Sequence, residues 1–288
     1  MGHIAFVTDS TAGLPADQEV KYGVTVVPLQ VVFGTESFRD GIDLTQGQFF
    51  ERLKQAKTLP TTTQPTAGDF ETTYRKLLNN PDVSSIISVH LSSKLSGTYS
   101  TASMVADRVS TEMRKPITVI DSLSAYLGEG LMVIDGARAA EAGKSHEEIV
   151  AMINGMVGDM QLLLLVDTLE YLQRGGRIGG AQAFIGGLLN IKPILRLKDG
   201  ALDPLERVRT RRKAMERLVE LGMEATQGKP CQVCVGHAQA PEDAQTLTRM
   251  IREKMNVTEE FTSELSPTIS SHTGPGVLGF VYYVLPTK

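Results

Sequence analysis

The sequence predicts an α/β protein with two domains. Through the first half of the chain, short apolar runs alternate with longer helical patterns, which is typical of βαβ units and a mostly parallel sheet. After about residue 158, strand pairs joined by helices favour an α+β fold. The length of 288 residues suits two domains of about 150 residues each. We therefore expect an α/β domain over residues 1–158 and an α+β domain over residues 159–288.

Residue patterns assign the elements of the first half. Strands are expected at 4–8, 24–32, 85–91 and 117–121. Helices are expected at 15–22, 45–53, 68–78, 97–109 and 145–157. Two helix starts carry capping signals, because Ser145 stands three residues before Glu148 and Thr66 three residues before Asp69.

The second half reads as hairpins and helices. The dipeptide Asp199-Gly200 interrupts a strand-like region at 192–211 and predicts a hairpin turn. Further strands are expected at 161–166, 232–237, 260–265 and 279–285, with helices at 211–224 and 241–254.

Composition limits the class of protein. The chain is 41% hydrophobic and 22% charged, with a net charge of −4, which excludes disordered, collagen-like and coiled-coil chains. A mildly acidic balance gives no general attraction to nucleic acid or to anionic membranes. No apolar run approaches the ~18 residues that cross a bilayer. Two cysteines cannot form a disulfide framework, so we expect a cytoplasmic protein without nucleic-acid partners or membrane insertion.

Several motif matches fail on context. The G-x-G-x-x-G match at 274–279 precedes a predicted strand, whereas a dinucleotide site needs the strand before it. The match to a phosphate-binding loop that ends at Ser145 has the wrong glycine spacing. Cys231 and Cys234 lie three apart on a predicted strand, so they point to opposite faces, and no second cysteine pair completes a zinc site. We expect no metal site and no nucleotide site.

Polar loops stand where the predicted strands end. They are 9–11 after the first strand, 61–66 before a helix, 92–98 between a strand and a helix, and 121–124 after the fourth strand. In an open α/β sheet, ligands bind outside the carboxyl ends of the strands, and helix N-termini favour anions. His272, expected in a loop between strands, has hydroxyls and glycines on both sides. We expect it to face a ligand across a domain interface.

Taken together, these segments resemble the DegV family, which includes the fatty-acid-binding B subunits of bacterial fatty acid kinase. The matching pieces are VTDST at 7–11, TTQP at 62–65, SSKLSGTY at 92–99, VIDS at 119–122, GGRI at 175–178, KPI at 192–194, RT at 209–210 and HTGPG at 272–276. They occur in family order along nearly the whole chain. One departure is Thr63, where the family usually has Ser, and it keeps the hydroxyl.

The resemblance implies a two-domain α/β fold that holds one long-chain fatty acid between the domains. It implies that Thr62, Ser96 and His272 bind the carboxylate, with Thr63 and Gly97 nearby. The long apolar tail would dominate the affinity, since each buried methylene contributes ~0.8 kcal/mol.

The resemblance also implies a partner. Arg209 corresponds to an arginine near the phosphoryl-transfer site, and Arg177 to one implicated in docking the kinase subunit. The protein would then be a carrier and no enzyme by itself. It would present the fatty acid carboxylate to a kinase catalytic subunit that supplies the nucleotide, and it would hold no cofactor of its own.

Two other functions remain open from the residues. Ser96 and His272 could act as nucleophile and base of a small hydrolase or transferase, with Asp9 or Asp121 as the orienting acid. The basic cluster at 207–213 could instead serve a regulatory ligand sensor. The shape of an acyl pocket could depend on residues 183–186 and Leu189, which also fit an ordinary helical core pattern.

Overall fold

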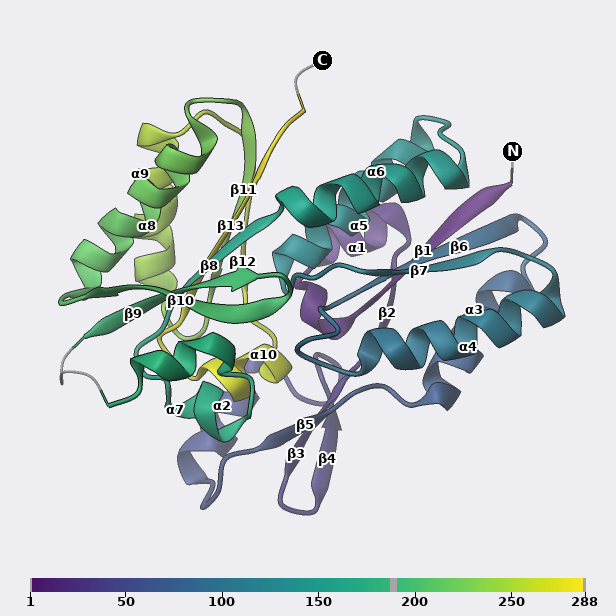
Figure 1. Cartoon of the computed structure of the whole chain (residues 1–288). Helices are drawn as coiled ribbons and strands as arrows, with labels where there is room; N and C mark the ends of the chain where they lie inside the picture. Colours follow the sequence, from purple (N-terminus) through teal and green to yellow (C-terminus); the bar gives the residue numbers. More distant parts are fainter. Residues whose placement is uncertain (1, 187–190, 287–288) are drawn as a thin grey trace.

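The computed structural model describes residues 2–186 and 191–286 (Figure 1). Its first sheet is parallel, with the order β2-β1-β6-β7. The strands are β1 (His3–Asp9), β2 (Thr25–Val27), β6 (Val83–His90) and β7 (Ile117–Asp121). Because the strands are parallel, their carboxyl ends share one edge. The predicted parallel α/β arrangement is confirmed, and the polar loops after β1, β6 and β7 meet at this edge.

The second sheet is mostly antiparallel, with the order β10-β9-β8-β13-β11-β12. Its strands are β8 (Gln161–Leu165), β9 (Lys192–Lys198), β10 (Ala201–Val208), β11 (Cys231–His237), β12 (Val257–Glu264) and β13 (Leu278–Val284). Only the pairing of β11 with β12 is parallel among the pairs described. Asp199 and Gly200 join β9 to β10, as predicted. The two large sheets fall on either side of residue 158, although the domain boundary itself stays a prediction.

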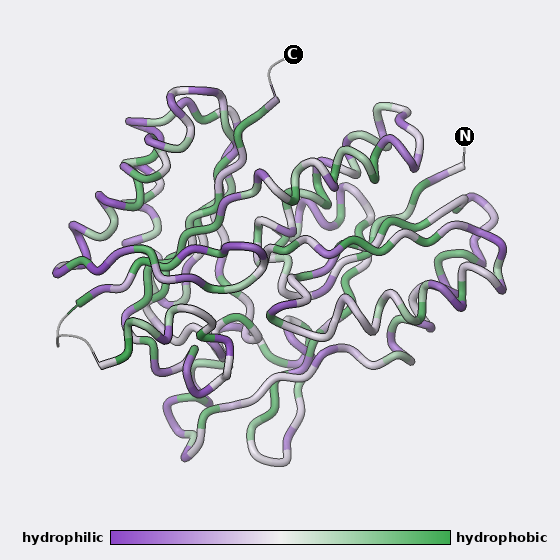
Figure 2. The backbone as a smooth tube through the Cα atoms, in the orientation of Figure 1, coloured by the Kyte–Doolittle hydropathy of each residue, from purple (hydrophilic) through white to green (hydrophobic). Residues whose placement is uncertain are grey.

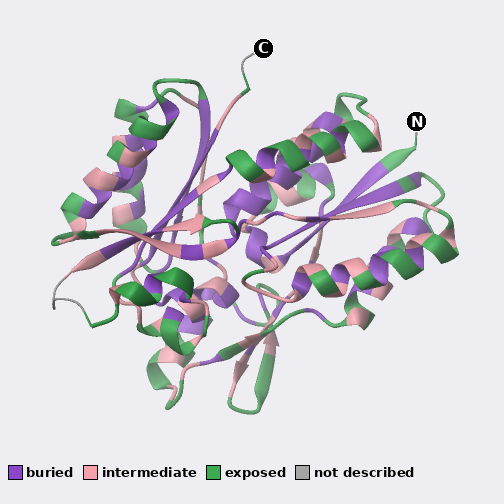
Figure 3. Ribbon diagram, in the orientation of Figure 1, coloured by how far each residue is buried: buried purple, intermediate pink, exposed green. Residues whose placement is uncertain are grey.

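Helices and sheets alternate in layers (Figures 1 and 3). The helices of these layers are α3 (Ala67–Leu78), α4 (Thr98–Met113), α5 (Leu127–Glu141), α6 (His146–Asp159), α8 (Arg211–Thr226) and α9 (Pro241–Lys254). Helices α3 and α4 cover one face of the parallel sheet, and α5 and α6 lie between the two sheets. Helices α8 and α9 cover the outer face of the second sheet. Every residue from 127 to 134 of α5 is buried, as expected of a helix enclosed on all sides.

A small antiparallel sheet, β4-β3-β5, corrects two predictions. Its strands are β3 (Gln30–Phe33), β4 (Glu36–Arg39) and β5 (Thr61–Thr63). Residues 24–32 do not form one strand, because Pro28 separates β2 from β3 and these belong to different sheets. The expected loop at 61–66 begins instead with β5, which pairs with β3.

The remaining elements are shorter. They are η1 (Ser10–Ala12), α1 (Ala16–Tyr22), α2 (Gln46–Gln55), α7 (Glu170–Arg174), η2 (Gly179–Phe184) and α10 (Pro267–Thr273). His272 therefore lies on a helix and not in the expected loop. The sequence carries the signal for α10, because the hydroxyl of Ser266 accepts the N–H of Ile269 and Pro267 occupies the first turn. The capping boxes predicted at Thr66 and Ser145 are confirmed.

Apolar residues concentrate in the strands and on the inner helix faces (Figure 2). Cys231 and Cys234 are free and buried, and they belong to the cores on opposite faces of the second sheet, as predicted. Within the described residues, no helix is both long enough and apolar enough to cross a membrane.

Candidate functional site

A cavity of about 410 Å³ lies between the carboxyl edge of the parallel sheet, the second sheet and α10. Its wall is mainly apolar. Leucines from both halves of the chain contribute to it, among them Leu91, Leu95, Leu162, Leu164, Leu197 and Leu202. Polar side chains also contribute, among them Thr62, Gln64, Ser96, Arg177, Thr268 and His272. Apolar surface still predominates, which suits a ligand that is mostly hydrocarbon with a polar group at one end.

Four of the predicted site residues share this wall with Arg177: Thr62, Thr63, Ser96 and His272. They come from β5, from the loop after β6 and from α10. Residues separated by more than 200 positions thus meet, and the Thr62 hydroxyl lies 2.8 Å from His272 Nε2.

Ser96 belongs to a tight turn that leads into α4. Its N–H donates to the carbonyl of Ser92, and its hydroxyl lies 2.9 Å from the hydroxyl of Thr98. Gly97 follows as the N-cap of α4 and does not line the cavity. A Cβ atom at this position would collide with the side chain of Gln64, which does line it. Gly97 therefore permits the close approach of β5 and this turn.

The first glycine of the GGRI segment, Gly175, makes room for His272. A Cβ atom on Gly175 would collide with His272 Nδ1, and this nitrogen has no hydrogen-bond partner within the described part of the chain. Arg177 closes the same corner, donating from Nε to the carbonyl of Leu95 at 3.1 Å and from Nη1 to the carbonyl of Gly175 at 2.6 Å.

The electrostatics of this corner keep His272 neutral. Burial lowers the pKa of His272 to about 4, and the positive charge of Arg177 contributes to the shift. Near pH 7 the ring is therefore a neutral hydrogen-bonding group. An anion placed here would meet hydroxyl and imidazole donors, with the guanidinium of Arg177 nearby.

Arg209 lies outside the cavity. It is exposed, just after β10. Elsewhere in the basic cluster, Arg211 forms ion pairs with Asp167 and Asp243, and Arg212 pairs with Glu216. These pairs reduce the net positive charge that the cluster presents.

Of the residues expected to shape an acyl pocket, the four that the structure describes, at 183–186, do not line this cavity. Ala183, Ile185 and Gly186 are exposed, so the core interpretation is also wrong for them. Phe184 is partly buried, and the guanidinium of Arg207 stacks 4.4 Å from its ring centre. Leu189 lies outside the described residues.

The geometry does not favour a hydrolase. His272 Nε2 contacts Thr62, and the Ser96 hydroxyl contacts Thr98. Asp9 and Asp121, the proposed orienting acids, bind other partners. Asp121 accepts the backbone N–H groups of Ser93 and Leu123, and Asp9 accepts from His90, Thr11 and the N–H of Leu91.

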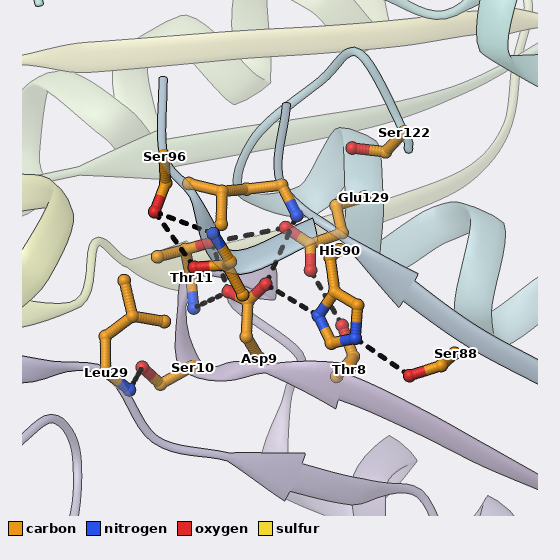
Figure 4. Close-up of polar contacts among 12 residues, drawn as sticks. Thr8, Asp9, Ser10, Thr11, Leu29, Ser88, His90, Ser96, Ser122 and Glu129 are labelled. Atoms are coloured by element: carbon orange, nitrogen blue, oxygen red, sulfur yellow. Dashed lines mark hydrogen bonds and ion pairs between the residues drawn. The ribbon is translucent and has the colours of Figure 1, made fainter. Parts of the chain in front are cut away.

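Sequence reasoning missed a second polar cluster, which is drawn in Figure 4. Ser88, His90 and Asp9 form a chain, with 2.8 Å from Ser88 Oγ to His90 Nε2 and 3.0 Å from His90 Nδ1 to Asp9 Oδ2. The order of groups resembles a catalytic triad, but all three residues are completely buried (0% exposed). Ser88 and His90 stand two apart on one strand, a spacing that could have suggested a shared face.

Comparison with known proteins identifies the family. The family model described as "Uncharacterised protein, DegV family" matches residues 3–285. The chain belongs to the DegV family. Among DegV relatives, a DegV domain-containing protein of Streptomyces coelicolor is 38% identical over 280 residues, covering 97% of this chain and 98% of the relative. The protein DegV of Bacillus subtilis is 36% identical, covering 97% and 99%.

Solved DegV structures have the same fold. One from Thermus thermophilus, described as showing fatty acid binding of a DegV family protein, superposes with a TM-score of 0.92 at 37% identity and covers 98% of this chain and 100% of that one. DegV from Bacillus subtilis, described as a fatty acid binding protein, has a TM-score of 0.87 at 36% identity, with 99% and 100% covered. The DegV fold implied by the resemblance is confirmed.

Proposed function

We propose that this protein binds one long-chain fatty acid in the cavity. The acyl chain would lie along the leucines, and Thr62, Ser96 and His272 would bind the carboxylate. The observation that supports this most directly is the mainly apolar cavity that has these three polar side chains in its wall. DegV structures described as fatty acid binding, at 36–37% identity, support the same ligand.

Simple energetics agree with this ligand. A chain of about fifteen methylenes contributes up to ~12 kcal/mol of burial free energy before the costs of binding are subtracted. The tail therefore supplies most of the affinity. Neutral donors are sufficient for the carboxylate and leave its oxygens less tightly held than a lysine pair would. A loosely held carboxylate can still attack a phosphoryl donor.

We further propose that the protein presents this carboxylate to the catalytic subunit of a fatty acid kinase and then carries the acyl phosphate. Two features support the proposal. Arg209 is exposed and therefore available to stabilise charge that develops during phosphoryl transfer from a partner. Arg177 lies in the cavity wall beside His272 and is partly exposed, where it can contribute to docking of the kinase subunit. The free, buried Cys231 and Cys234 suit a reducing cytoplasm.

The ligand is tested by native mass spectrometry of the purified protein, followed by organic extraction. We expect a stoichiometric adduct that extracts as a long-chain fatty acid, and a lower occupancy in Thr62→Val. Protein that is empty and also fails to take up added palmitate or oleate would overturn the proposal.

The kinase step is tested separately with palmitate-loaded protein, a fatty acid kinase catalytic subunit and ATP. We expect acyl phosphate formation that requires this protein, and a lower rate with Arg209→Ala or Arg177→Ala while palmitate remains bound. Lys229→Ala, a change at an exposed cation elsewhere on the same half of the chain, is the control. Loaded wild-type protein that supports no acyl phosphate formation would contradict the carrier role and leave fatty acid binding standing.

A further inference from the structure

A buried acidic cluster lies beside the loops that build the polar end of the cavity (Figure 4). Asp9 comes from β1, His90 from β6 and Glu129 from α5, and all three are completely buried (0% exposed). One nitrogen or oxygen from each lies within 4.8 Å of the others. Two carboxyl groups this close either bind a cation while both are ionised, or one of them stays protonated. The hydrogen bonds of the cluster bear on which of these two states is present.

Asp9 has the hydrogen bonds of an ionised carboxylate. Its Oδ1 accepts the N–H of Thr11 at 3.0 Å and the hydroxyl of Thr11 at 2.6 Å. Its Oδ2 accepts the N–H of Leu91 at 3.2 Å and Nδ1–H of His90 at 3.0 Å. All four acceptor positions are therefore used by donors.

His90 has the hydrogen bonds of a neutral ring. Its Nδ1 donates to Asp9, and its Nε2 lies 2.8 Å from the hydroxyl oxygen of Ser88, which lies 2.9 Å from the hydroxyl oxygen of Tyr74. A neutral ring satisfies both contacts when Tyr74 donates to Ser88 and Ser88 donates to Nε2. With this direction of donors, His90 supplies no second proton to offset a second carboxylate.

Glu129 is that second carboxyl group. Its Oε1 accepts the hydroxyl of Thr8 at 2.7 Å, and its Oε2 lies 3.2 Å from the hydroxyl oxygen of Thr11. Thr11 has a single hydroxyl proton, and the shorter bond to Asp9 uses it. A proton on Glu129 Oε2 would turn the 3.2 Å contact with Thr11 into a hydrogen bond in which Glu129 donates.

We propose that Glu129 keeps its proton at neutral pH and acts as a positioning residue for the polar end of the cavity. Burial, followed by the charge of Asp9, raises the pKa of Glu129 well above its usual range. The titratable groups that face Glu129 are Asp9 from β1 and, beyond it, His90 from β6. Two buried carboxylates this close cannot both ionise without a cation.

With Glu129 protonated, Asp9 carries the single negative charge of the two carboxyl groups. Asp9 then fixes two backbone segments by accepting hydrogen bonds from their N–H groups. One is η1, through the N–H of Thr11, and the other is the loop that begins at Leu91. That loop carries Leu95 and Ser96 to the cavity. The link to ligand binding rests on the proposed function, whereas the protonation state does not.

Glu129→Gln tests the protonation state, because the amide can accept from Thr8 and donate in place of the carboxyl proton. We measure the unfolding equilibrium constant between pH 5.5 and 8.5. The unfolded wild type releases a proton that the folded state keeps, so at each pH below the folded-state pKa of Glu129 its unfolding constant rises about tenfold more per pH unit than that of Glu129→Gln. Glu141→Gln, on the exposed end of the same helix, should retain the wild-type slope.

Equal pH slopes for wild type and Glu129→Gln would overturn the proposal. So would a stoichiometric divalent metal in the purified wild type that Glu129→Gln has lost, since the cluster would then be a metal site. If Glu129→Gln does not fold, carboxyl-carbon NMR of the wild type decides instead. We expect a buried glutamate resonance at the protonated position at pH 7, and a full set of ionised resonances would contradict this.

The positioning of the two backbone segments, which protonated Glu129 leaves to the charge of Asp9, is tested with Asp9→Asn. We expect faster amide exchange at Leu91 and at least a tenfold loss of palmitate affinity, with affinity and exchange changing together. Unchanged exchange at Leu91 would contradict the role. Wild-type protein that binds no palmitate would refute the proposed function alone, because the proton linkage of Glu129 is measured without ligand.

Discussion

Two histidines at neighbouring sites have opposite surroundings. His90 is completely buried, with Asp9 on one nitrogen and Ser88 on the other. His272 stands at a cavity wall, contacts the hydroxyl of Thr62 and has Arg177 nearby. The hydrogen bonds of His90 resemble those of a catalytic triad, but His90 does not line the cavity. The surroundings of His272 instead suit a bound anion.

The two sites differ in where the carboxylate that contacts the histidine comes from. Asp9 satisfies His90 and two backbone N–H groups, so the buried cluster is complete without a ligand. Among the contacts described, no carboxylate hydrogen-bonds to His272, and the Nδ1 atom of His272 has no hydrogen-bond partner. In our proposal, the ligand brings the carboxylate. Changes at the first site should therefore lower stability as well as affinity, whereas changes at the second site should lower affinity with little change in stability.

The largest expected effect is on stability. Asp9→Ala leaves the N–H groups of Thr11, Leu91 and His90 buried without an acceptor, so we expect the free energy of unfolding to fall by about 3–5 kcal/mol. Urea denaturation measures it. Asp121→Ala is the matched control, because Asp121 also accepts two backbone N–H groups but is partly exposed and water can replace it. A comparable loss in the two variants would contradict the distinction.

The next effect is on affinity. Thr62→Val keeps the shape of the side chain but removes the hydroxyl at His272. Hydrogen bonds to charged groups contribute about 1.5–3 kcal/mol, so palmitate should bind roughly 10- to 100-fold more weakly, with little change in stability. Calorimetric titration of delipidated protein measures the affinity. Thr61→Val on the same strand is exposed and outside the cavity wall, and an equal loss there would argue against a head-group role.

Acid should destabilise the protein through His272. Its pKa falls from an ordinary 6.5 to about 4, because of burial and then Arg177. Below pH 6.5 the unfolded chain takes up a proton that the folded chain refuses, so stability declines as the pH falls from about 6.5 to about 4. His272→Gln should lose less stability across this window, whereas His3→Gln, a change at an exposed histidine, should follow the wild type. Identical profiles for all three proteins would show that His272 titrates normally.

The smallest effects concern two glycines. Gly175→Ala places a methyl group against His272 Nδ1, so we expect a severalfold loss of palmitate affinity. Gly155→Ala in α6 meets no atom within 4 Å and should stabilise the protein by about 0.5–1 kcal/mol, because alanine favours the helix. Thermal unfolding and palmitate titration of both variants separate the two outcomes. A weaker palmitate affinity in Gly155→Ala as well would show that the loss in Gly175→Ala does not come from its contact with His272.

Patterns local in sequence predicted much of the fold. Alternation of apolar runs gave the parallel strands, and the pairs Thr66 with Asp69 and Ser145 with Glu148 marked helix starts that the structure contains. Predictions failed where a short segment joined a distant partner. β5 has only three residues, and its pairing with β3 is invisible in a local pattern.

The candidate site was predicted in part by motif order. Thr62, Thr63, Ser96 and His272 do share one cavity wall. The buried cluster was not predicted, because Asp9, His90 and Glu129 lie on three separate elements: β1, β6 and α5. Only the sheet order β2-β1-β6-β7 makes β1 and β6 neighbours. Each of the three residues is unremarkable in its own segment.

The sequence by itself determined many of the longer strands and helices, two capping boxes and the family, because periodicity, capping pairs and motif order are properties of short segments along the chain. Tertiary structure decided which polar residues are neighbours and which of them meet a cavity. Those outcomes depend on strand order and on the packing of α5 between two sheets. Burial then sets the charge, so that Asp9 and Glu129, both carboxylic acids, have opposite protonation states in our proposal.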